Sequence, residues 1–133
     1  MKFAVYQIQM TREIADKVKA GETVPAFEAR NKMNLDFAGH KIGGLADEAL
    51  TAGFYTHVAN IEADSANDVF EIGNMGPESA ITRFSRMHSL SVGDLIVDEE
   101  GNVMVVANYG FVAIGFKPEM SAANLVYNME EVA

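Results

Sequence analysis

The strongest constraint on the fold is a period-two pattern in the C-terminal half of the chain, where short apolar runs are separated by turn-forming residues. Residues 95–97 alternate between two faces, the acidic loop 98–102 follows, and an apolar run returns over 103–108. Such alternation places successive side chains on opposite faces of a strand, so the two runs predict an antiparallel hairpin. A third run over 111–116 follows a Tyr-Gly turn and extends the hairpin into a meander.

The first third of the chain predicts a strand and a helix, followed by an ambiguous stretch. Residues 2–9 alternate as a largely buried strand does. Thr11 is a suitable N-cap and Gly21 a suitable stop for the helix between them. Pro25 permits a strand only at its start or on an edge, so we expect 26–37 to hold one bent strand or two short ones.

The middle of the chain predicts several short helices around one strand. A helix with a narrow apolar stripe ends before Gly53, and residues 54–61 form the strand. Asp64 is expected to cap the next helix. Pro77 suits the first turn of another helix, built on Ala80, Ile81 and Phe84.

The pattern as a whole predicts one small α+β domain over residues 1–133, with a mostly antiparallel sheet, a C-terminal hairpin or meander and several short helices. The sequence contains no internal repeat and no low-complexity linker. The tail 117–133 is expected to be flexible, with at most a weak helix through Leu125, Val126 and Met129.

Composition narrows the class of function. The chain has no cysteine, which removes disulfides and thiolate metal sites and fits a reducing compartment. Its opening does not resemble a signal peptide, and its apolar runs are shorter than the roughly 20 residues of a membrane helix. We therefore expect a cytoplasmic protein that has no membrane contact. The net charge of −9 argues against direct binding of nucleic acid through a broad basic face.

The charge is unevenly distributed along the chain. Residues 1–41 contain seven basic and five acidic side chains, whereas residues 42–133 contain three basic and fourteen acidic ones. This pattern has two interpretations: a solvated acidic surface, or a face that docks on a basic partner. The candidate partner-binding residues of that acidic face are Asp47, Glu48, Glu62, Asp64, Asp68, Glu71, Glu78, Asp98, Glu99 and Glu100.

The string 87–94 contains a base, two hydroxyls and a carboxylate, namely His88, Ser89, Ser91 and Asp94. Neighbours in an extended chain point to opposite faces, so these residues are poorly placed for a catalytic triad. We interpret Ser91 and Asp94 as groups that hydrogen-bond the local backbone of a turn. The three histidines are scattered and no metal-ligand spacing is present, so the sequence predicts no catalytic residue, no metal and no cofactor.

The glycine-rich loop 39–44 is the alternative candidate site. Its backbone N–H groups and Lys41 precede a helix, and such a position suits a phosphate group. The loop matches neither the Walker nor the dinucleotide fingerprint, which favours simple flexibility. The residues of this candidate ligand loop are Gly39, His40, Lys41, Gly43 and Gly44.

The segment His88-Ser89-Leu90-Ser91-Val92-Gly93-Asp94, together with Tyr109-Gly110-Phe111, resembles the YodL-like domain over roughly residues 54–116. In that family a His-Ser-Leu-Ser-Val segment precedes an apolar strand, and a second strand ends near an aromatic-Gly-Phe; Gly93 stands where a serine is expected. Similar domains occur in phages and plasmids. The resemblance implies an accessory protein acting inside a bacterial cell, with no established enzymatic activity, and marks His88, Ser89, Ser91, Asp94, Tyr109 and Phe111.

Two functions follow as expectations. The first is a non-enzymatic phage or mobile-element protein that uses its acidic face to bind a host protein with a basic surface. It would inhibit or otherwise modulate that host protein, for example a defence or nucleic-acid-processing factor. The second is a nucleotide-binding or nucleotide-sequestering protein that uses the loop 39–44. A homo-oligomer is compatible with either function.

Overall fold

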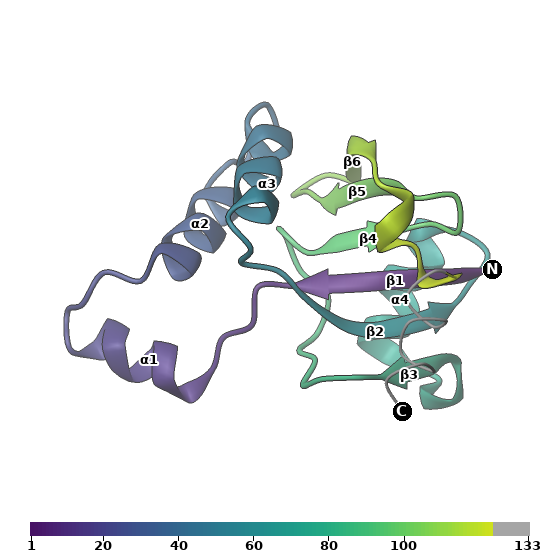
Figure 1. The fold of residues 1–133 in the computed structure, drawn as a ribbon, viewed down its shortest axis with the longest axis horizontal. Helices are drawn as coiled ribbons and strands as arrows, with labels where there is room; N and C mark the ends of the chain where they lie inside the picture. Colours follow the sequence, from purple (N-terminus) through teal and green to yellow (C-terminus); the bar gives the residue numbers. More distant parts are fainter. Residues whose placement is uncertain (124–133) are drawn as a thin grey trace.

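The structure is a computed structural model, and it describes residues 1–123. Its centre is a six-stranded sheet in which all neighbouring strands are antiparallel (Figure 1). The strands are β1 Lys2–Gln7, β2 Thr56–Glu62, β3 Ile81–Arg83, β4 Leu95–Val97, β5 Asn102–Val106 and β6 Phe111–Phe116, in the spatial order β3-β2-β1-β4-β5-β6. The predicted α+β class and the C-terminal meander are confirmed.

Within the described residues, four α-helices and two 3-10 turns connect or flank the strands. They are α1 Arg12–Lys19, α2 Pro25–Asn34, α3 Ile42–Thr51, α4 Ala66–Met75, η1 Glu78–Ala80 and η2 Pro118–Met120. Thr11 caps α1 as predicted, because its hydroxyl accepts a hydrogen bond from the Ile14 N–H. None of the described helices is long and apolar enough to cross a membrane.

The central strand β1 is buried on both faces of the sheet, which explains why it reads as a nearly continuous apolar segment. On one face Ala4 and Tyr6 pack with residues of α2 and α3, among them Met33 and Ile42. On the other face Phe3 and Val5 pack with Val69 of α4. The alternation of β1 therefore divides its side chains between two apolar layers.

The prediction of strands over 26–37 was wrong, because this stretch contains α2. Pro25 occupies the first turn of that helix, where its missing N–H leaves no hydrogen bond unmade. The alternation that suggested a strand is superficial: Met33 is fully buried, whereas Leu35 and Phe37 are 68% and 65% exposed. The predicted helix with Pro77 in its first turn was also wrong, since η1 leads directly into the short edge strand β3, which pairs with β2.

Two further expectations are corrected at the ends of elements. Ser65, and not Asp64, caps α4, with its hydroxyl accepting from the Asp68 N–H. The part of the tail over 117–123 is packed, because Ser121 is buried and donates its hydroxyl hydrogen bond to the backbone oxygen of Glu99. The weak helix expected through Leu125, Val126 and Met129 lies outside the described residues.

The N-terminal helices form an arm at one end of the sheet, opposite the end at which β1 begins (Figure 1). The arm starts after β1, where residues 8–11 leave the sheet, and it returns to the sheet through α3, which packs against β5 and β6. None of the residues of α1 is fully buried. The junction between arm and sheet is thus bordered by the start of α1, by α2 and by the chain that follows β3.

Candidate functional site

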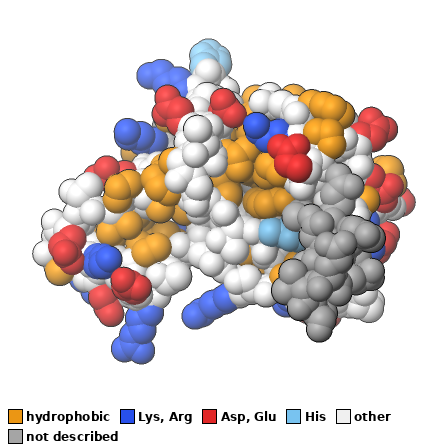
Figure 2. Space-filling model, in the orientation of Figure 1, with side chains coloured by type: hydrophobic (Ala, Val, Ile, Leu, Met, Phe, Trp, Pro, Cys, Tyr) orange, Lys and Arg blue, Asp and Glu red, His pale blue; other side chains and the backbone are white. Residues whose placement is uncertain are grey.

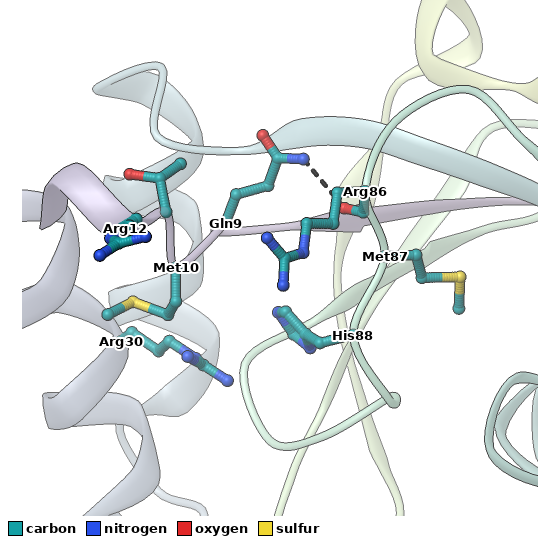
Figure 3. A pocket seen from close by; sticks show the side chains of 8 residues that line it. Gln9, Met10, Arg12, Arg30, Arg86, Met87 and His88 are labelled. Atoms are coloured by element: carbon teal, nitrogen blue, oxygen red, sulfur yellow. Dashed lines mark hydrogen bonds between the residues drawn. The ribbon is translucent and has the colours of Figure 1, made fainter. Parts of the chain in front are cut away.

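Three of the chain's four arginines line one cavity at the junction between arm and sheet. The cavity has a volume of about 370 Å³. Arg12 is the first residue of α1, Arg30 lies within α2, and Arg86 follows β3. Residues far apart in the sequence therefore meet here, together with Gln9, Met10, Thr11, Met87 and His88 (Figure 3).

The three arginines of this cavity form no ion pair with neighbouring side chains of residues 1–123. Among the same residues, no carboxylate lines the cavity. The fourth arginine, Arg83, is paired with Glu78 at 2.6 Å between Nη2 and Oε1. In a chain of net charge −9, the three arginines without an ion pair in the described residues thus line the same cavity. A guanidinium presents a planar fork of donors that matches phosphate and carboxylate oxygens, so the arrangement suits an anion.

Gln7 fixes the backbone of His88 at the wall of this cavity. The Gln7 side chain is fully buried, and its amide Nε2 donates to the backbone oxygen of His88 at 2.9 Å. Its Oε1 accepts from the backbone N–H of His88 at 3.2 Å. Gln7 lies on β1 and bonds both the backbone oxygen and the backbone N–H of His88. Gln7 therefore acts as a positioning residue for His88.

The imidazole of His88 has one occupied and one free nitrogen. Nδ1 lies 2.8 Å from the backbone oxygen of Ser89. A carbonyl oxygen only accepts, so the neutral ring carries its proton on Nδ1. Nε2 is buried and has no hydrogen-bond partner in the described part of the chain. In Figure 3 the guanidinium groups of Arg30 and Arg86 both turn toward this ring.

A buried carboxylate lies behind His88. Asp94 is 2% exposed, and its Oδ2 accepts from Gln7 Nε2 at 3.0 Å and from the Ser91 N–H at 2.9 Å. Burial raises the pKa of Asp94 to about 6, against the opposing effects of these hydrogen bonds and of the nearby His88 and Arg30. Asp94 is therefore a structural acceptor at the base of the turn 91–94.

The structure brings some of the residues of the His-Ser-Leu-Ser-Val segment together and separates others. Asp94 bonds the local backbone as predicted, but the Ser91 hydroxyl has no hydrogen-bond partner among residues 1–123. Ser89 is exposed, and only its backbone oxygen contacts the His88 ring. The hydrogen bonds of His88 and Ser89 therefore do not form a serine–histidine relay. Tyr109 is 88% exposed at the β5–β6 turn, and Phe111 begins β6.

The glycine loop is less suited to a ligand than its sequence suggests. The N–H groups of Lys41 and Ile42 both donate to Oδ2 of Asp36, at 2.9 and 2.7 Å. The donors that would hold a phosphate are thus already bound to a carboxylate of the same chain. His40 and Lys41 are exposed within the loop, and Gly43 and Gly44 already belong to α3.

The acidic residues lie on three separate parts of the fold. Figure 2 shows carboxylates scattered over the visible face, among hydrophobic and uncharged atoms. Several are also engaged: Glu62 pairs with the N-terminal ammonium group, and Asp98 accepts four hydrogen bonds within its own turn. The groups are Asp47 and Glu48 on α3; Asp64, Asp68, Glu71 and Glu78 around α4 and η1; and Glu62, Asp98, Glu99 and Glu100 at the end of the sheet where β1 begins.

The arginine cavity was missed by sequence reasoning. Arg12, Arg30 and Arg86 belong to no recognisable spacing, and each resembles an ordinary solvated cation in the sequence. The one available signal was the prediction that the chain 1–41 is net positive, which placed two of the three arginines in the same region. No local pattern links them to Arg86.

Comparison with known proteins adds no relative. No family model matches the chain, and neither the curated proteins nor the solved structures contain a match. The resemblance to the YodL-like domain stays a prediction, and the functional argument rests on the geometry of the arginine cavity.

Proposed function

We propose that this chain is a non-enzymatic binding protein whose cavity at Arg12, Arg30 and Arg86 takes a small phosphate-bearing molecule. The observation that carries the proposal is that three arginines, none of which forms an ion pair within residues 1–123, line one cavity of an acidic protein. Binding would replace solvent around these cations with charge-assisted hydrogen bonds, which are the stronger class of hydrogen bond in proteins. The proposal keeps the expected ligand class, a nucleotide-like phosphate compound, and moves it from the loop 39–44 to the arginine cavity.

The charge and the size of the cavity favour a phosphate over a single carboxylate. Three guanidinium groups match a phosphate monoester, which has more negative charge and more acceptor oxygens than one carboxylate. The volume of about 370 Å³ lies at the lower end of the range for small-molecule sites. Arg12 and Arg86 are exposed, so the interaction is expected to weaken as salt is added.

Titration calorimetry with inorganic phosphate, phosphate monoesters, sulfate and acetate tests the proposal. Arg30→Gln and Arg86→Gln are each expected to weaken phosphate binding about tenfold or more, since a hydrogen bond to a charged group is worth about 1.5–3 kcal/mol. Lys41→Gln is the matched control, because it removes an exposed cation from the loop 39–44. The proposal fails if no phosphate compound binds at millimolar concentration, or if Lys41→Gln alone removes binding.

A second proposal retains the expected protein partner. We propose that a basic host protein docks on exposed carboxylates, with the chain acting as an inhibitor or modulator from a phage or mobile element. Its support is the set of exposed acids without an ion pair within the described residues, among them Asp47 and Glu48 on α3 and Glu71 on α4. The three-way distribution of the acids weakens this proposal relative to the first.

Capture of partners from a bacterial lysate at low and high salt tests this second proposal. Asp47→Asn/Glu48→Gln and Glu71→Gln are compared separately, because they alter different parts of the fold. A partner that is retained by both variants and at high salt would contradict docking through these carboxylates.

A further inference from the structure

His88 stands between the arginine cavity and a second cavity of about 410 Å³. Met87 and His88 line both. The second cavity continues along the C-terminal end of α4 and the start of η1, with Asn74 and Glu78 among its lining residues. A ligand anchored at the arginines can therefore extend past Met87 and His88 into a space with polar walls.

The free nitrogen of His88 requires a donor. Its Nδ1 carries the proton that is donated to the Ser89 carbonyl, so Nε2 of the neutral ring presents a lone pair. A buried acceptor without a partner is unusual in folded proteins and incurs a desolvation cost. Gln7 holds the backbone of His88 from both sides, so the acceptor is kept at this wall.

We infer, resting on the proposed function, that the ligand is a phosphate ester of a hydroxyl-bearing group, as in a sugar phosphate or a nucleotide. The phosphate lies among the arginines, and a hydroxyl close to it donates to Nε2 of His88. In Figure 3 the Arg86 guanidinium turns toward the ring, and its side chain is exposed. As part of this inference, Arg86 shifts onto the bound phosphate and gives the ligand hydroxyl access to Nε2. Met10 and Met87 supply pliable apolar contacts for the carbon skeleton.

Calorimetry with methyl phosphate and ribose 5-phosphate separates the hydroxyl contact from the phosphate contact. We expect the wild-type protein to bind ribose 5-phosphate about three- to tenfold more tightly, the effect of one well-formed hydrogen bond. His88→Asn retains a side-chain donor where Nδ1 lies and lacks Nε2, so it is expected to abolish the difference between the two ligands. His88→Gln places an amide oxygen near the position of Nε2 and is expected to retain part of the difference.

The outcomes distinguish this inference from the proposed function. If neither compound binds, the proposed function itself is wrong. If the wild-type protein binds both equally, or if His88→Asn weakens methyl phosphate as much as ribose 5-phosphate, the hydroxyl contact is refuted while the phosphate site stands. Arg30→Gln is the reference variant, expected to weaken both ligands alike, and thermal unfolding of each variant confirms that it is folded.

Adenosine 5′-monophosphate distinguishes the two sources of such a ligand. Binding that is tighter than that of ribose 5-phosphate assigns the second cavity to a nucleobase. Equal or weaker binding assigns the site to a sugar phosphate, and in either case the contact with His88 is retained.

Discussion

Replacing Asp94 by asparagine should stabilise the protein at neutral pH, although Asp94 is buried and hydrogen-bonded. Both hydrogen bonds of the carboxylate go to a single oxygen, Oδ2, so an asparagine oxygen in the same position can accept them. What the substitution removes is a buried negative charge. Burial raises the pKa of Asp94 from 3.8 to about 6, which corresponds to about 3 kcal/mol at 1.36 kcal/mol per pH unit.

The sign of the pH dependence follows from which state holds the proton. Between pH 4 and pH 6 the folded protein keeps the Asp94 proton while the unfolded chain has lost it, so the free energy of unfolding falls as the pH rises. Above pH 6 both states are ionised and the loss is complete. Asp94→Asn and wild type should therefore be similar in stability near pH 4, and the variant should be more stable above pH 6 by up to about 3 kcal/mol.

Urea unfolding at pH 4, 5, 6, 7 and 8 measures this difference directly. The other titrating groups are present in both proteins, so the difference between the two curves isolates Asp94. Asp64→Asn is the matched control, because it removes an exposed carboxylate. A constant loss of stability for Asp94→Asn at every pH would show that the carboxylate is needed for its hydrogen bonds, and the reasoning would be refuted.

Two further predictions concern backbone and core. Gly101→Ala should lower the free energy of unfolding by about 2–5 kcal/mol, because φ is +101° and the new Cβ would meet the backbone of Pro118. Gly21→Ala is the control: its φ is +79° but its Cβ would point into open space, so it should lower the free energy of unfolding by only about 1–2 kcal/mol. Equal losses in guanidinium unfolding would contradict the close contact. Met33→Ala should cost about 2–5 kcal/mol because the side chain is fully buried, whereas Leu35→Ala, 68% exposed, should change thermal stability little. A small effect of Met33→Ala would show that the core refills the space.

Local sequence patterns predicted the elements that depend on residues close together in the sequence. The meander β4–β6 was readable because its apolar runs alternate and acidic or glycine-containing turns separate them. Thr11 as the cap of α1 was readable because the cap acts within one turn. The stretch 26–37 was misread because proline is compatible with two local structures, and only the packing of Met33 against α3 and the sheet selects the helix.

The sequence by itself determined the fold class, the antiparallel meander and the uneven charge, because each of these depends on neighbouring residues or on composition. The tertiary structure alone decided where the functional chemistry lies. It brought Arg12, Arg30 and Arg86 to one cavity, placed Gln7 behind His88, and spread the acids over three parts of the surface. These contacts depend on long-range packing between β1, the helical arm and the chain after β3. Residues so far apart in the sequence share no periodic pattern from which the contacts could be predicted.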